Sequence, residues 1–116
     1  IQYTHARACS ILRKAKKKTG KPAYGLLKEK IEHEIVLDLA SFPDVFIEAT
    51  EFLKPNMVAD FANALSDKFN TFYNALPVIK AEPKELSDAR LASVDAVRIV
   101  LRNALNLIGV VAPERM

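Results

Sequence analysis

The stretch PNMVADFANALSDKFNTFYNALP, residues 55–77, decides the fold class of this 116-residue chain. Its apolar side chains recur every three or four residues, the spacing of one face of an amphipathic helix. Pro55 suits the first turn of a helix, and Pro77 ends it because proline lacks the backbone N–H that continues the ladder. An apolar face of this length must be buried against other helices. Its members are Met57, Val58, Phe61, Ala62, Leu65, Phe69, Phe72, Tyr73 and Leu76.

The same spacing predicts helices before this stretch. Residues 1–19 form the first, and residues 25–42 form the second, which Pro43 ends. A short third helix fills the interval up to Pro55. The loop between the first two helices, residues 19–25, combines glycines with a proline and is expected to be mobile.

A fifth helix is expected from about Pro83 to Gly109, because glycine is the residue expected just past the end of a helix. Valine and isoleucine at 94, 97, 99 and 100 would also suit a strand, but the helical period persists over a much longer window. Short connections between amphipathic helices favour antiparallel neighbours. The sequence therefore predicts an all-α fold, an antiparallel bundle of about five helices.

Length and composition limit the function classes. With 50% hydrophobic and 27% charged residues, the chain has the balance of one globular domain covering residues 1–116. No apolar run reaches the ~20 residues that span a bilayer and no secretion signal is present, so a cytoplasmic protein without a membrane partner is expected. One cysteine excludes an internal disulfide, and no metal-ligand set is found. Because the sequence opens at Ile1 inside a helical pattern, we interpret it as a piece of a longer protein.

Positive charge is concentrated at the N-terminal end. Residues 1–30 contain nine Lys or Arg against one acidic residue, whereas the remaining residues contain eight basic and thirteen acidic side chains. Clustered cations favour a polyanion, because binding releases counterions from phosphates. The alternative is a solvated, lysine-rich helix end, which the helix dipole also favours.

No residue set in the sequence suits catalysis. A glycine-rich phosphate loop, paired carboxylates and a Ser–His or Cys–His arrangement are all missing. His5 and His33 are interpreted as surface or packing residues, and Cys9 as a small buried side chain. Two acidic and basic neighbours are interpreted as ion pairs on a helix surface: Asp88 with Arg90, and Asp95 with Arg98.

Several short motifs, in order and at consistent spacing over nearly the whole chain, resemble the C-terminal anticodon-binding domain of arginyl-tRNA synthetases. Asp95-Ala96-Val97-Arg98 resembles, with Val for Leu, the Asp-Ala-Leu-Arg signature for which this helical domain is named. The other matching segments are Ile1-Gln2-Tyr3-Thr4-His5-Ala6-Arg7, Ser10-Ile11-Leu12-Arg13, Phe42-Pro43, Phe69-Asn70-Thr71-Phe72-Tyr73-Asn74, Ser87-Asp88-Ala89-Arg90-Leu91-Ala92, Val100-Leu101-Arg102-Asn103-Ala104-Leu105 and Ala112-Pro113-Glu114-Arg115-Met116.

The resemblance implies a helical bundle appended to a Rossmann-type catalytic core that uses ATP, with magnesium, to join arginine to its tRNA. The family's His-Ile-Gly-His and Lys-Met-Ser-Lys catalytic signatures are missing from this sequence, so no cofactor is expected in this domain. All arginine codons have a central G, so every arginine anticodon has a central cytosine. Bases of a single-stranded loop can be stacked on aromatic rings and read on their Watson–Crick edges. The expected partners are arginine tRNAs and the rest of the synthetase chain.

The resemblance also implies a tRNA-binding site. Tyr3 and Tyr73 match aromatic positions of the family and are expected to stack anticodon-loop bases, and Met116 to place its sulfur and carboxylate in the same pocket. Arg7, which lies one helical turn after Tyr3 on the same face, is expected to bind a phosphate or a base. The alternatives are helix packing for Tyr3 and an intramolecular ion pair for Arg7. Nonspecific phosphate attraction is expected from Lys14, Lys17 and Lys18.

Two other classes of protein remain open at this point. A structural or protein-interaction bundle would have the same amphipathic helices, and it would show no preference among RNAs. The related helical domain of another synthetase, such as the cysteinyl or glycyl enzyme, would differ in the anticodons that it selects.

Overall fold

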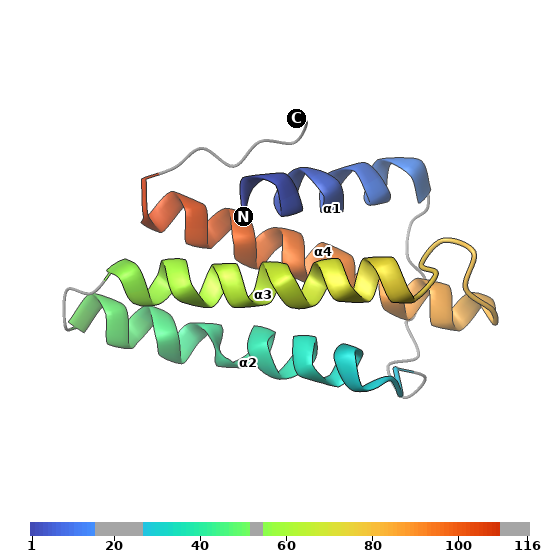
Figure 1. Ribbon diagram of the computed structural model, residues 1–116, viewed down its shortest axis with the longest axis horizontal. Coiled ribbons are helices and arrows are strands. Elements are labelled where there is room, and N and C mark those ends of the chain that lie inside the picture. The colour runs from blue at the N-terminus through green and yellow to red at the C-terminus, as the bar shows by residue number, and fades with distance from the viewer. Residues whose placement is uncertain (16–26, 52–54, 110–116) are drawn as a thin grey trace.

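The structure is a computed structural model that describes residues 1–15, 27–51 and 55–109. These residues form four helices and no strand: α1 (Gln2–Ala15), α2 (Lys30–Glu51), α3 (Pro55–Ala75) and α4 (Lys84–Leu107). Successive helices run in opposite directions, as Figure 1 shows. The predicted all-α antiparallel bundle is therefore confirmed, with four helices in place of about five.

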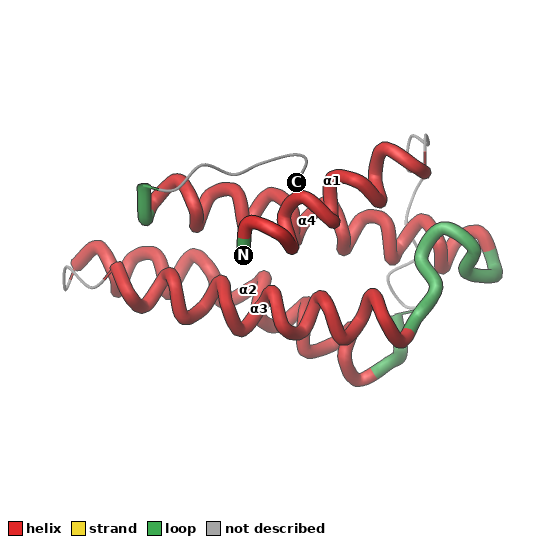
Figure 2. Tube along the Cα trace, turned by 45° about the horizontal axis from the view of Figure 1, so that its top comes forward, coloured by secondary structure: helices red, strands yellow, loops and turns green. Residues whose placement is uncertain are grey.

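The helices form two pairs, α2 with α3 and α1 with α4 (Figure 2). The loop that follows α3 leads across to α4 and so connects the two pairs at one end of the bundle. This arrangement brings the N-terminal helix close to the end of α3, although about 70 residues separate them in the sequence.

The predicted break at Pro43 is wrong. Residues 30–51 form one helix with Pro43 inside it, whereas the sequence pattern predicts two helices on either side of this proline. A proline inside a helix removes one backbone hydrogen bond. Packing on both sides of it outweighs that loss: the rings of Phe42 and Phe61 lie 5.4 Å apart between α2 and α3, and Ala49 is buried further along α2.

The core consists of the apolar faces predicted for the long helices. Phe69 and Phe72 of α3 are buried, with their ring centroids 6.0 Å apart, and Val94 and Val97 of α4 are buried opposite them in the same cluster. Residues 84–107 are helical, so the choice of helix over strand for the valine-rich segment is confirmed. Gly109 has φ +78°, and its N–H donates to the Asn106 carbonyl oxygen, as expected for a glycine just past a helix end.

One of the two predicted surface ion pairs is wrong. Asp95 and Arg98 form theirs, with 2.8 Å between Oδ1 and Nη2. Arg90 instead is buried and pairs with Glu32 of α2, at 2.8 Å between Nη2 and Oε1. Residues two apart on a helix point to different sides, so Asp88 and Arg90 do not face each other.

The predicted start of the second helix at residue 25 is wrong, because residues 27–29 are not helical and α2 begins at Lys30. Cys9 and His5 are both buried in α1. None of the helices described is both long enough and apolar enough to cross a bilayer. The loop at residues 19–25 lies outside the described residues.

Candidate nucleic-acid interface

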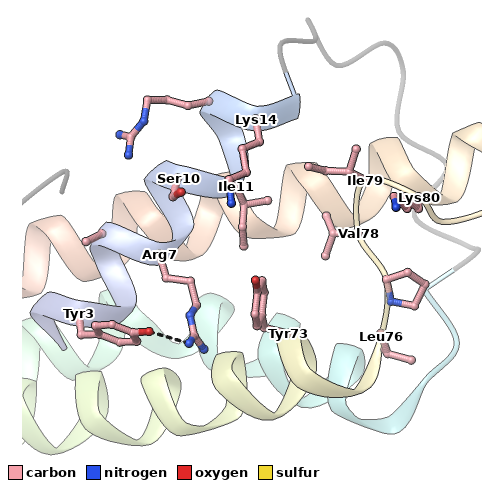
Figure 3. Close-up of a pocket in the computed structure, with 13 residues that line it drawn as sticks. Tyr3, Arg7, Ser10, Ile11, Lys14, Tyr73, Leu76, Val78, Ile79 and Lys80 are labelled. Carbon is pink, nitrogen blue, oxygen red and sulfur yellow. Dashed lines mark hydrogen bonds between the residues drawn. The ribbon is translucent and has the colours of Figure 1, made fainter. Parts of the chain in front are cut away.

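A groove of about 730 Å³ lies between α1 and the end of α3. Figure 3 shows its two walls, the face of α1 that carries Arg7 and Ile11 and the segment that follows Tyr73. Both walls combine basic and apolar side chains, and none of the described lining residues is acidic. The lining residues are Tyr3, Ala6, Arg7, Ser10, Ile11, Arg13, Lys14, Tyr73, Leu76, Pro77, Val78, Ile79 and Lys80.

Arg7 lies between two tyrosine rings at the mouth of this groove. Its Cζ is 4.8 Å from the ring centroid of Tyr3 and 4.5 Å from that of Tyr73, within the range of cation–π contacts. Its Nη2 also donates a hydrogen bond of 2.8 Å to the Tyr3 hydroxyl. Tyr3 is 55% exposed and Tyr73 is 40% exposed, so both rings are open to a ligand.

Asn70 holds the other side of the guanidinium. Arg7 Nη1 donates to Asn70 Oδ1 at 3.1 Å, and Asn70 Nδ2 donates to Thr4 Oγ1 at 3.3 Å. Every partner that the described part of the chain provides for Arg7 is uncharged. Its positive charge is therefore not neutralised by a carboxylate there, which leaves it available to an anion.

Further cations follow Arg7 along the groove. Arg13 and Lys14 extend from the last turn of α1, and Lys80 extends from the loop on the opposite wall. The apolar part of the lining comes from Ile11 and the aliphatic residues of the loop. A groove with aromatic rings at its mouth, cations on both walls and an apolar lining suits a single-stranded nucleic acid, whose bases stack and whose phosphates are anionic.

The comparisons with known proteins agree with this chemistry. A family model described as the DALR anticodon binding domain matches residues 1–116. This chain belongs to the DALR anticodon binding domain family. The arginine–tRNA ligase of Pyrococcus abyssi is 48% identical and that of Methanosarcina barkeri 45% identical, each over all of this chain.

A solved structure supports the same assignment. The arginyl-tRNA synthetase of Thermus thermophilus matches 99% of this DALR domain at 37% identity, with a TM-score of 0.90. The domain spans only about a fifth of these longer proteins: 19% of the Pyrococcus relative, 21% of the Methanosarcina relative and 20% of the Thermus chain. The resemblance to the DALR domain of arginyl-tRNA synthetases, predicted from the motifs, is therefore confirmed.

The structure of the DALR domain brings together four of the seven residues predicted for the site. Tyr3, Arg7 and Tyr73 are in mutual contact through the guanidinium, and Lys14 lines the same groove. Their roles in binding stay predictions. The other three predicted residues lie outside the described residues: Lys17, Lys18 and Met116.

Sequence reasoning missed Asn70, which binds Arg7, and the loop residues that line the groove. Asn70 lies one turn before Tyr73, so the helical period already placed both on one side of α3. Lys80 and the aliphatic residues 76–79 belong to a loop, and loop residues carry no periodic signal that would place them against α1.

Proposed function

We propose that the groove around Tyr3, Arg7 and Tyr73 binds the anticodon loop of arginine tRNAs. The observation that carries the proposal is the arrangement of one guanidinium between two half-exposed tyrosine rings, at the mouth of a groove without acidic lining residues. Each part of this arrangement matches one part of an unpaired nucleotide: rings match the faces of bases, and cations match phosphates.

The central anticodon cytosine is the most useful base for such a site to recognise, because all arginine tRNAs share it. Stacking contributes on the order of 1–3 kcal/mol per base but does not distinguish one base from another. Discrimination requires hydrogen bonds to the Watson–Crick edge, for which cytosine offers one amino donor and two acceptors. The Arg7 guanidinium, a hydrogen-bond donor, lies against both rings.

The proposal includes the longer protein to which this domain belongs. Residues 1–116 act as one domain at its C-terminal end, and the remaining part of the synthetase chain, its covalent partner, joins arginine to tRNA with ATP and magnesium. Protein synthesis places such an enzyme in the cytoplasm. The domain itself contributes tRNA selection and no catalytic group, in keeping with the lack of any catalytic residue set in its sequence.

The experiment compares two substitutions at one position in the full-length synthetase. Tyr73→Phe keeps the ring and removes only the hydroxyl, whereas Tyr73→Leu keeps an apolar side chain without a ring. We expect Tyr73→Leu to raise the KM for arginine tRNA by roughly 5- to 150-fold, the equivalent of one lost stacking contact, and Tyr73→Phe to change it little. Equal KM values for the two variants would refute stacking on this ring.

A substituted tRNA separates this function from the alternatives. Replacement of the central anticodon cytosine should raise the KM of the wild-type enzyme, and it should raise the KM of Arg7→Met less, because that variant has already lost the hydrogen-bond donor beside the rings. A protein-interaction bundle would show no such dependence on the anticodon. The domain of a cysteinyl or glycyl enzyme would select different anticodon bases.

A further inference from the structure

The loop after α3 forms one complete wall of the groove. Five consecutive residues, 76–80, line it, and Figure 3 shows Val78 and Ile79 on the side that faces α1. Loops of this kind have few contacts of their own that fix their path. The only backbone hydrogen bond that an amide of residues 77–81 makes with another described residue is that from Ala81 N–H to the Val78 carbonyl oxygen, at 3.4 Å. The position of this wall therefore depends on contacts from elsewhere in the fold.

Arg90 of α4 supplies one of these contacts. Its Nη1 donates a hydrogen bond of 2.7 Å to the carbonyl oxygen of Pro77. The same guanidinium donates from Nε to Glu32 Oε1 of α2 at 2.9 Å, and its Nη2 lies 2.8 Å from that oxygen. A planar guanidinium with donors at fixed angles can connect a carboxylate to a carbonyl in one geometry only.

Ser87, one turn before Arg90, makes a second contact with the loop. Its Oγ donates to the carbonyl oxygen of Ile79 at 3.1 Å. Ser87, Arg90 and Glu32 are all buried, Arg90 at 6% and Glu32 at 3% exposure, and none of them lines the groove. Ser87 and Arg90 contact the groove wall through its carbonyl oxygens.

The energetics of a buried ion pair suggest that the pair of Arg90 and Glu32 fixes the position of the loop more than it stabilises the fold. Removing two charges from water costs several kcal/mol per ion, and apolar residues of similar volume often stabilise a protein equally well or better. The pair in this structure is also incompletely satisfied, because Glu32 Oε2 is buried without a hydrogen-bond partner among the described residues. What apolar side chains cannot replace is the bond to the Pro77 carbonyl.

We propose that Arg90, held by Glu32 and assisted by Ser87, is a positioning residue that fixes the 76–80 wall of the groove for tRNA binding. The inference rests on the proposed function of the groove. In this proposal the buried Arg90 side chain contributes to tRNA selection without contacting the RNA, because it holds the loop that does.

The main test is the double variant Glu32→Leu with Arg90→Met in the full-length synthetase. Both charges leave together, so no unpaired charge stays buried, and the volumes are similar. We expect the KM for arginine tRNA to rise roughly tenfold with kcat within about twofold, because small displacements of positioning groups cost this much or more in binding. Hydrogen exchange should quicken at the Ala81 amide, whose N–H donates to the Val78 carbonyl oxygen, and stay unchanged in α1.

A second ion pair between two helices, more exposed than Arg90 and Glu32, provides the control. Asp38 of α2 and Lys68 of α3 also join two helices, at 2.9 Å between Oδ2 and Nζ, but neither lines the groove. The variant Asp38→Leu with Lys68→Met should keep the wild-type KM. An equal rise of KM in both double variants would overturn the proposal, because a general loosening of the bundle would then explain it.

Ser87→Ala keeps the proposal testable if the double variant is unstable. It removes one hydroxyl from the second loop contact, and we expect a KM rise of roughly threefold at an unchanged unfolding temperature. Wild-type KM values in Ser87→Ala and in a folded double variant would refute the positioning role. Tyr73→Leu distinguishes a failure of this inference from a failure of the proposed function. If Tyr73→Leu keeps the wild-type KM, the groove does not bind the tRNA. If only Tyr73→Leu raises the KM, the groove binds the tRNA but Arg90 does not position its wall.

Discussion

The contact between Arg7 and Tyr73 makes a sharp prediction about how their effects on tRNA binding combine. The guanidinium lies 4.5 Å from the Tyr73 ring centroid, and a cation–π contact at an exposed site contributes about 0.5–1 kcal/mol. Tyr73→Leu therefore removes both a stacking platform and part of what holds Arg7. Arg7→Met removes the cation and part of what holds the ring.

A double-mutant cycle measures this shared part. Tyr73→Leu should weaken tRNA binding by about 1–3 kcal/mol through lost stacking. The double variant should lose about 0.5–1 kcal/mol less than the two single variants together, a factor of roughly 2–5 in Kd, because each single change already breaks the contact. Kd for arginine tRNA is measured by filter binding with the full-length synthetase.

The salt dependence of the same four proteins provides an independent measurement. Removal of one phosphate-binding cation should lower the slope of log Kd against log salt by about 0.7, the value for single strands. Arg7→Met should show this change, and Tyr73→Leu should keep the wild-type slope because it removes no charge. Additive losses in the cycle, together with an unchanged slope for Arg7→Met, would refute the view that the two residues form one site.

Three further predictions concern other parts of the domain. Lys80→Ala should lower the slope of log Kd for tRNA against log salt by about 0.7. Lys84 is an exposed lysine just beyond the loop and outside the groove lining, so Lys84→Ala should leave the slope unchanged. A lower slope in both variants would indicate nonspecific electrostatic attraction and not a specific site. Asn70→Ala should raise the Kd for tRNA roughly 3- to 10-fold through loss of the bond that orients Arg7, at a wild-type salt slope; a changed slope would show that Asn70 does not act through orientation alone. Gly109→Ala should destabilise the domain by about 1 kcal/mol in urea unfolding, because φ +78° disfavours any Cβ although nothing lies within 4 Å of it; a stabilised variant would contradict the observed backbone conformation.

The fold class was predictable because the helices carry their own signal. The apolar face of residues 57–76 specifies a buried helix, and Phe69 and Phe72 are in the core where that spacing places them. Gly109 likewise marks the end of α4 through a purely local requirement, a positive φ. Pro43 misleads for the opposite reason, since the contacts that carry the helix past it come from α3.

The candidate site was predictable only in part. Tyr3 and Arg7 share a face of α1 by spacing alone, and their structure agrees. Tyr73 was predicted to belong to the same site only from the resemblance to a family, because no local sequence pattern relates residues 66 or more positions apart. The partner of Arg90 was predicted as Asp88, its near neighbour in sequence, and the structure replaced it with Glu32 from another helix.

The amino-acid sequence by itself determined that the chain is helical and which faces of its helices are apolar, because spacing along one helix is set by backbone geometry. It also determined where the positive charge is concentrated, but not that one helix continues through Pro43. Only the tertiary structure decided that the guanidinium of α1 lies between rings from α1 and α3, and that a buried arginine of α4 reaches a carbonyl in the groove wall. These contacts depend on how the four helices pack, and packing is settled by the fit of whole faces against one another, which no single segment encodes.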